Sequence, residues 1–185
     1  LQSMLQSIML SCSSQVDRQN AEFHAFFQSR SAASAVSDGT QALHLMMDSS
    51  RVQEDLTRSL CWVNKVPWNI FVAVRRWVDV PVWSEFRCFC FQGRITAISQ
   101  YNFTVHYPLQ VCSRKEEIVR MILDYFNKSG LKERLPLSNC VLDLVVPEHE
   151  DWKKVKLLEI NPFVVTTSSC LFNWARDLDI LKGVG

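Results

Sequence analysis

The chain of 185 residues lacks several features that would assign a protein to a functional class at once. Lysine and arginine nearly balance aspartate and glutamate, and the formal net charge is +1, so no global field favours nucleic acid or an anionic membrane surface as a partner. No apolar run approaches the ~20 residues that a membrane-spanning helix needs. The first residue is Leu rather than Met, and we expect a fragment or a processed product.

Paired cysteine motifs are absent as well. The chain has seven cysteines, an odd number, and no Cys-x-x-Cys pair occurs among them. Cys88 and Cys90 would lie on one face of a strand as small buried hydrophobes. We therefore interpret the cysteines as structural thiols in a reducing compartment, rather than as zinc ligands or disulfides, and expect a cytoplasmic protein.

Proline is missing from residues 1–66, and glycine occurs there only once. The segment is rich in Leu, Met, Ala, Gln and Ser, with apolar residues at helical spacing, which predicts helices. Asp38-Gly39 marks a turn between helices, and Asp48-Ser-Ser50 can cap a further helix that runs through Leu60. We assign residues 1–66 to a mostly helical N-terminal part and residues 67–185 to a second lobe.

Strands are expected where the composition changes, at residues 69–78, 85–91 and 94–99. The last two runs flank Gln92-Gly93 and predict a hairpin. Charged residues inside apolar strands cost stability unless they are paired or bind something. Four such residues interrupt these runs: Arg75, Arg76, Glu85 and Arg87. Structural ion pairing and anion binding are both open for them.

A helix and a second hairpin follow. Ser113-Arg-Lys-Glu116 has the form of a capping box, which predicts a helix that ends before Gly130. Residues 141–146 and 155–163 are strand-like runs on either side of a polar loop that begins at Pro147. The predicted fold class is α+β, with an antiparallel sheet and flanking helices.

The second hairpin brings three oxygen-bearing side chains together. Strand alternation puts Glu159 and Asn161 on one face, together with Leu157. A loop centred near residue 151 puts Asp143 roughly opposite Glu159. Facing carboxylates repel each other unless a cation neutralises them, and a magnesium ion that bridges to phosphates is one such cation. A rim of solvated acids is the alternative.

An ordered series of motifs runs through the second lobe. The motifs are Val74-Arg-Arg-Trp77, Ser84-Glu-Phe-Arg-Cys-Phe89, Ala97-Ile-Ser-Gln-Tyr-Asn-Phe-Thr104, Leu142-Asp143, Leu158-Glu-Ile-Asn-Pro-Phe163 and Leu171-Phe172-x-Trp174. In this series the chain resembles the cell division cycle protein 123 family, from roughly residue 38 to residue 174. The whole series is far more specific than any single piece of it.

The resemblance implies an ATP-grasp-like fold that holds Mg-ATP between two lobes. It also implies a role as an assembly chaperone for eukaryotic translation initiation factor 2 through its gamma subunit, which is a binding role rather than turnover. Asp143, Glu159 and Asn161 match the family's magnesium-ligand positions, and Asp143 also belongs to the implied ATP site.

The resemblance implies further ATP contacts. Arg75, Arg76 and Trp77 match the strand that leads into the adenine hinge. Val78 would offer backbone hydrogen bonds to adenine, and Asp79 would hold the ribose hydroxyls. Arg87 would face the phosphates, a role that suits arginine because its fixed fork of donors matches phosphate oxygens.

Departures from the family pattern leave two other functions open. The family has Gly-Glu and a later Asp at positions that are Val164-Val165 and Ser168 in this chain. It also has an arginine at the position of Tyr101. Lys65 is the only lysine in residues 1–66, where the family has a lysine-bearing segment that holds phosphate. One alternative is a degenerate nucleotide-binding domain that serves as a protein-binding module. The other is an ATP-dependent ligase, by analogy of fold alone.

Overall fold

The computed structural model describes residue 25, residues 35–62 and residues 71–184. These residues belong to two compact units: the described residues between 35 and 79 form one, and residues 80–184, with which residue 25 is grouped, form the other. The boundary predicted between residues 66 and 67 lies outside the described residues, as do nearly all of the first 34 residues. Within the described ranges, no helix has both the length and the apolar character needed to cross a membrane.

The unit before Val80 contains two helices, α3 (Gly39–Met47) and α4 (Ser50–Trp62). The Asp38 carboxylate caps α3 by accepting a hydrogen bond from the backbone N–H of Gln41 at 2.9 Å. The Ser49 hydroxyl accepts from the backbone N–H of Val52 at 3.4 Å at the start of α4. The predicted cap within Asp48-Ser-Ser50 is therefore confirmed, and Asp38-Gly39, predicted as a turn between helices, is the place where α3 begins. At both places a side-chain oxygen satisfies a backbone donor that has no partner inside the helix.

The same unit ends in an extended segment, residues 71–79, that belongs to neither a helix nor a strand. The prediction of a strand over residues 69–78 is wrong for its described part. Phe71 and Val74 are 85% and 88% exposed. An apolar, β-branched run forms a strand only where a neighbouring strand satisfies its backbone groups, and no described strand pairs with this segment.

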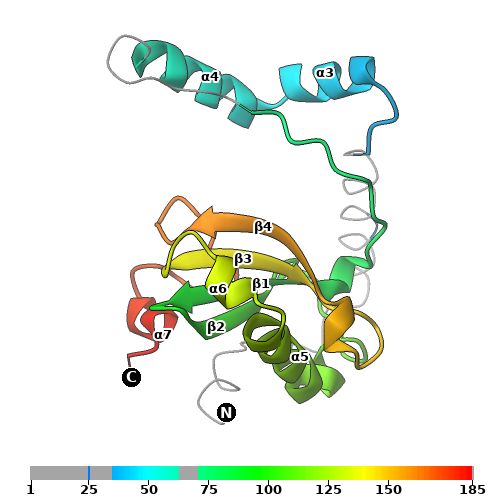
Figure 1. Cartoon of the computed structure of the whole chain (residues 1–185), viewed down its shortest axis with the longest axis vertical. Coiled ribbons are helices and arrows are strands. Elements are labelled where there is room, and N and C mark those ends of the chain that lie inside the picture. Colours follow the sequence, from blue (N-terminus) through cyan, green and yellow to red (C-terminus); the bar gives the residue numbers. More distant parts are fainter. Residues whose placement is uncertain (1–24, 26–34, 63–70, 185) are drawn as a thin grey trace. The chain divides into compact units, whose positions relative to one another are not determined.

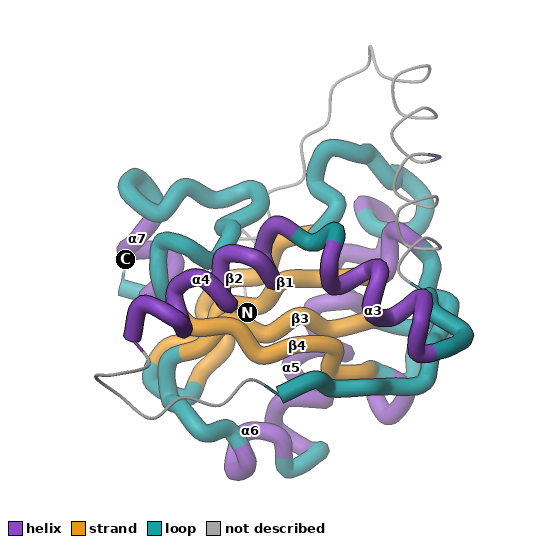
Figure 2. Tube along the Cα trace, turned by 90° about the horizontal axis from the view of Figure 1, so that it is seen from above, coloured by secondary structure: helices purple, strands orange, loops and turns teal. Residues whose placement is uncertain are grey.

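The unit after Val80 is built on a four-stranded antiparallel sheet, whose strands lie side by side in Figures 1 and 2. The order is β2-β1-β3-β4. The strands are β1 (Glu85–Phe91), β2 (Arg94–Gln100), β3 (Cys140–Val145) and β4 (Lys156–Pro162). Both predicted hairpins, and with them the α+β class, are confirmed. The turn residues between β1 and β2, Gln92 and Gly93, both have positive φ, as a tight two-residue hairpin turn requires.

Helical elements precede, connect and follow the strands. They are η1 (Val82–Ser84), η2 (Cys112–Arg114), α5 (Lys115–Lys128), α6 (Leu131–Arg134), η3 (Trp152–Lys154) and α7 (Leu178–Lys182). The predicted capping box is wrong, because the Ser113 hydroxyl donates to the carbonyl of Leu109 rather than capping α5. The chain enters α5 through the tighter η2 turn, which puts Ser113 beside the preceding turn. Gly130, with φ of 73°, lies directly after the C-cap Ser129 and ends α5 as predicted.

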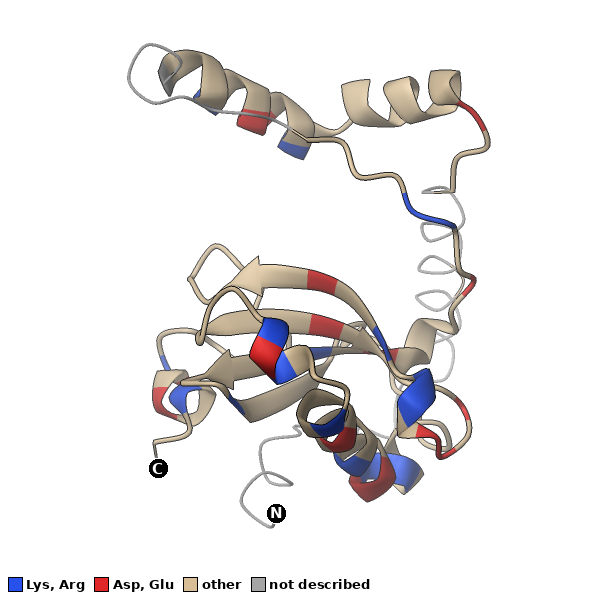
Figure 3. Cartoon of the chain, viewed as in Figure 1, with Lys and Arg blue, Asp and Glu red and all other residues tan. Residues whose placement is uncertain are grey.

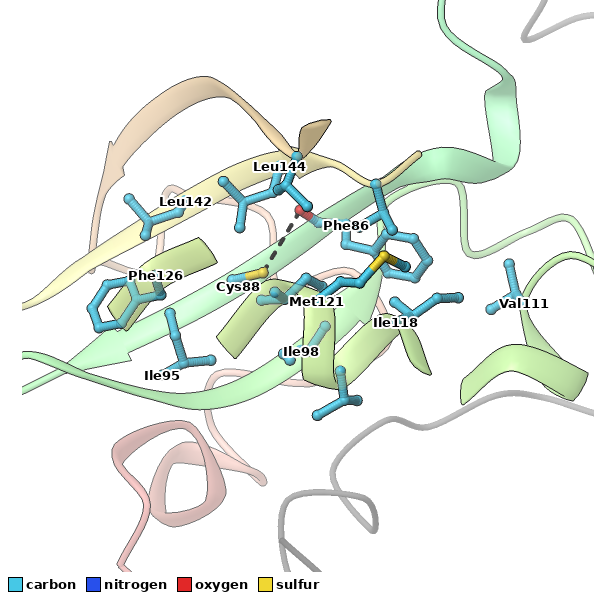
Figure 4. Packing of buried hydrophobic residues seen from close by; sticks show 14 of the residues in the cluster. Phe86, Cys88, Ile95, Ile98, Val111, Ile118, Met121, Phe126, Leu142 and Leu144 are labelled. Atoms are coloured by element: carbon cyan, nitrogen blue, oxygen red, sulfur yellow. Dashed lines mark hydrogen bonds between the residues drawn. The ribbon is translucent and has the colours of Figure 1, made fainter. Parts of the chain in front are cut away.

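Helix α5 covers one face of the sheet, and the main core lies between them (Figure 1). Figure 4 shows Phe86, Cys88, Leu142 and Leu144 of the sheet together with Ile118, Met121 and Phe126 of α5. All of these side chains are at most 2% exposed. Cys88 and Cys90 both lie in this core, so the prediction that they share a buried face is confirmed.

A bulge in β4 changes which of its residues share a face. Asp143 is paired with Glu159, but Leu144 is paired with Leu157, so Leu158 is the extra residue of the bulge. Leu157 consequently packs against the core under α5, whereas Glu159 faces away from it. Strict alternation had put Leu157 and Glu159 on one face. That prediction is wrong for Leu157, because one inserted residue reverses the facing of the strand before it.

Candidate functional site

An aromatic cluster occupies part of the sheet face away from α5. Phe89 of β1 meets Phe163, Phe172 and Trp174 edge to face, with ring centroids 6.3, 5.6 and 5.8 Å away. Leu181 of α7 is fully buried in the same cluster. The cluster anchors the segment after β4 to the sheet, and this segment supplies a backbone contact to the neighbouring polar site.

A polar row crosses this face of the sheet beside the aromatic cluster. Ser99, Arg87, Asp143 and Glu159 come from β2, β1, β3 and β4, and each is the cross-strand partner of the next. Figure 3 shows the acidic positions of β3 and β4 side by side. Direct cross-strand partners place their side chains on one face within reach of each other. The predicted opposition of Asp143 and Glu159 is therefore confirmed.

Arg87 and Asp143 form a bidentate ion pair at the centre of the row. Nε of Arg87 donates to Oδ1 of Asp143 at 2.8 Å, and Nη2 donates to Oδ2 at 2.7 Å. The remaining nitrogen, Nη1, donates to the backbone carbonyl of Ser168 at 2.8 Å, and the ring of Tyr101 lies 4.8 Å from the guanidinium carbon. Arg87 and Asp143 are 4% and 1% exposed. Every guanidinium nitrogen of Arg87 is thus engaged by the protein itself.

Asn161 and Glu159 complete the row on β4. The side-chain Nδ2 of Asn161 donates to Oδ2 of Asp143 at 3.0 Å. Glu159 is exposed at the end of the row. The carboxylate of Asp143 is therefore surrounded by donors, while that of Glu159 is open to an outside ligand.

Burial and charge shift the titration of this site. Burial raises the pKa of Asp143 and the charge of Glu159 adds to the rise, while hydrogen bonds from Arg87 and Asn161 oppose it. Burial by itself would lower the pKa of Arg87, but its hydrogen bonds to Asp143 and the charge of that carboxylate outweigh burial and raise it. The pKa of Glu85 is raised to about 7, first by burial and next by the charge of Asp143. The charge of Glu85 thus interacts with those of Asp143, Arg87 and Glu159.

The residue types in the row fit a hard divalent cation. Two carboxylates and one amide are ligands of the kind that Mg²⁺ takes in proteins. Among the described residues, no three His, Cys, Asp or Glu side chains converge as a metal centre, so Asn161 would have to contribute. Arg87 already neutralises one of the two carboxylates. Of the two interpretations of the charged strand residues, ion pairing therefore holds for Arg87, with Asp143 as its partner.

The structure brings together four of the predicted site residues, namely Arg87, Asp143, Glu159 and Asn161. The other five belong to the extended segment of the other unit, and their contacts to ATP stay predictions: Arg75, Arg76, Trp77, Val78 and Asp79.

Two contacts of Arg87 were missed by sequence reasoning, which treated Tyr101 and Ser168 only as departures from a family pattern. Tyr101 follows Ser99 by two residues, so period-two alternation could have placed it on the face of Arg87. No side-chain signal could have revealed the contact with Ser168, because a backbone carbonyl makes it.

Comparison with known proteins gives a family and a set of relatives. The family model D123 matches residues 25–180. The translation initiation factor eIF2 assembly protein of Xenopus laevis is 31% identical over 103 residues, which are 56% of this chain and 29% of that protein. The protein of the same name from Sclerotinia sclerotiorum is 35% identical over 112 residues, which are 59% of this chain and 26% of that protein. The chain thus spans less than a third of these relatives.

A solved structure shows the same fold. The C-terminally truncated Cdc123 from Schizosaccharomyces pombe superposes with a TM-score of 0.62 at 23% sequence identity. The match covers 78% of this chain and 57% of that chain.

Proposed function

The chain belongs to the D123 family, as its motif series predicted, and from this premise we propose that it acts in the assembly of eukaryotic translation initiation factor 2. Two relatives from distant organisms are assembly proteins of this factor by name, which supports the proposal. The gamma subunit is the proposed point of contact, and the cytoplasm is the proposed compartment.

The second part of the proposal is an ATP-grasp-like site for Mg-ATP. The observation that carries it is the polar row, in which Asp143 faces Glu159 and Asn161 lies beside them on the same face. These three residues would hold Mg²⁺, and a bound ion would neutralise phosphate oxygens. Arg87 would hold phosphate through its fork of donors, while the segment Arg75–Asp79 would hold adenine and ribose.

Calorimetric titration with Mg-ATP tests the nucleotide site. Wild type should release heat on binding, and Glu159→Gln should bind about tenfold or more weakly, because it loses a charged ligand without disturbing the buried pair. Glu148→Gln, at an exposed position of the loop between β3 and β4, is the matched control and should bind as wild type does. Absence of heat from wild type refutes this part of the proposal.

A second function is favoured by the engagement of Arg87. All three of its nitrogens already have acceptors inside the protein, which is the arrangement expected of a protein-binding module that has lost its nucleotide. Capture of the purified gamma subunit by the purified chain, with and without Mg-ATP, separates the two functions. Equal capture in both conditions, together with no heat from ATP, supports the module. Capture that requires Mg-ATP supports the nucleotide-dependent chaperone.

A further inference from the structure

The carboxylate of Asp143 already accepts three hydrogen bonds in the structure. Its carboxylate accepts from Nε and Nη2 of Arg87 and from Nδ2 of Asn161, at 2.8, 2.7 and 3.0 Å. A carboxylate offers about four lone-pair directions. Both directions of Oδ2 and one direction of Oδ1 are taken, so a cation that coordinates Asp143 through both oxygens must displace at least one donor.

The side chain of Asn161 is also oriented as a hydrogen-bond donor to Asp143 rather than as a metal ligand. The atom that faces Asp143 is the amide nitrogen, a donor, whereas a metal ligand has to present the amide oxygen. Two of the three proposed ligands are thus held together by a hydrogen-bond network in which Arg87 supplies the positive charge.

We propose that Arg87 is a built-in counter-ion, which competes with a divalent cation for Asp143 and is displaced from that carboxylate when the cation binds. The inference rests on the proposed Mg-ATP site and concerns which positive charge neutralises Asp143 before a cation binds. Arg87 is here a positioning residue, because it acts on the cation through Asp143.

The surroundings of Arg87 allow such an exchange. The carbonyl of Ser168 and the ring of Tyr101 hold the guanidinium independently of Asp143. Asp143 is the cross-strand partner of both Arg87 and Glu159, so the row sets two carboxylates against one guanidinium. A doubly charged cation compensates this charge better than the guanidinium does. Phosphate oxygens can then accept from the N–H groups that Asp143 releases.

The exchange predicts coupling between cation and phosphate. A cation that coordinates both oxygens of Asp143 in the absence of phosphate leaves the displaced N–H group of Arg87 without an acceptor, so the cation binds weakly. A cation together with phosphate supplies the replacement, so each ligand strengthens binding of the other by the same factor. Without Arg87, a cation alone should bind more tightly and the coupling should shrink.

Binding of Mn²⁺ in the absence of nucleotide, measured by electron paramagnetic resonance, tests the competition. Arg87→Gln should bind Mn²⁺ about tenfold more tightly than wild type, which is within the usual range of coupling between sites. Arg120→Gln, which removes an exposed arginine paired with Glu150, is the control and should bind as wild type does. A folded Arg87→Gln whose Mn²⁺ affinity is equal to or weaker than that of wild type overturns the inference. A purely structural arginine would give the weaker affinity.

A measurement on the wild-type chain covers the case in which Arg87→Gln does not fold. The Nε–H signal of Arg87, followed by nuclear magnetic resonance, should shift and exchange faster with water as Mg²⁺ and ATP are added together. A signal that stays unchanged when the site is saturated overturns the inference. If ATP does not bind at all, the proposed function fails, but the Mn²⁺ experiment still decides the competition because it uses no nucleotide.

Discussion

The same strands form both faces of the sheet, yet one face is packed by apolar side chains and the other carries a row of charged and polar ones. Leu142 and Asp143 are consecutive residues of β3, and they are 0% and 1% exposed. Leu142 packs in the apolar core under α5, whereas Asp143 is held by Arg87 and Asn161 on the other face. These two side chains are thus equally buried, and only the chemistry of their contacts separates a residue of the packing core from a residue of the candidate site.

The energetics of the two faces differ for the same reason. Each apolar side chain under α5 gains free energy by leaving water. On the other face, removing Arg87 and Asp143 from water costs free energy that their attraction only partly returns. A buried ion pair is therefore weak evidence for stability.

We expect the largest loss of unfolding free energy from a substitution at the centre of the polar row. Asp143→Ala leaves the guanidinium of Arg87 buried without a counter-charge and should cost about 4 kcal/mol of unfolding free energy. Arg87→Gln should cost less, because Asp143 can take up a proton when its partner is gone and Arg87 cannot lose one. Urea unfolding at pH 7 measures both variants. Equal costs would show that the two charges do not differ in this way.

A slightly smaller effect is expected on the apolar face. Leu142→Ala leaves a cavity under α5 and should cost about 3 kcal/mol. Ile160→Ala, at the cross-strand partner of Leu142 on the partly exposed strand β4, is the control and should cost less than about 1 kcal/mol. Urea unfolding at several pH values should show a cost of Leu142→Ala that does not depend on pH. A pH-dependent cost would mean that the two faces are coupled.

The pH dependence of stability should come from the polar face. The pKa of Glu85 is about 7 in the folded chain against an ordinary value of 4.5, so the folded state holds this proton more tightly. Glu85 therefore imposes no penalty below pH 4.5, a growing penalty as the pH rises toward 7, and the full penalty above it. With allowance for partial exposure, wild type should lose about 2 kcal/mol relative to Glu85→Gln between pH 5 and pH 8. Parallel stability curves for the two proteins, measured by urea unfolding, would contradict the assignment.

We expect the smallest effect on stability from a substitution at Glu159, a residue of the proposed cation site. Glu159 is exposed at the open end of the row, and Glu159→Gln should change unfolding free energy by less than about 0.5 kcal/mol. Thermal or urea unfolding of this variant, beside its affinity for Mn²⁺, separates stability from binding. A large loss of stability would place Glu159 in the structural part of the face rather than in a cation site.

Patterns of neighbouring residues predicted most of the secondary structure in the unit after Val80. The hairpin at Gln92-Gly93, the pairing of Asp143 with Glu159 and the end of α5 before Gly130 all follow from neighbours in sequence. The errors occurred where local patterns compete with packing. The bulge at Leu158 reverses one strand face, and Ser113 bonds the preceding turn instead of capping α5.

The sequence by itself determined which family the chain belongs to and that Asp143, Glu159 and Asn161 share one face, because strand periodicity and loop length set the register within a hairpin. The tertiary structure alone decided what Asp143 contacts. Arg87 lies 56 residues before it, and the two meet only because β1 pairs with β3 as well as with β2. That pairing depends on burying the apolar faces of all these strands under α5, a condition that no local pattern contains.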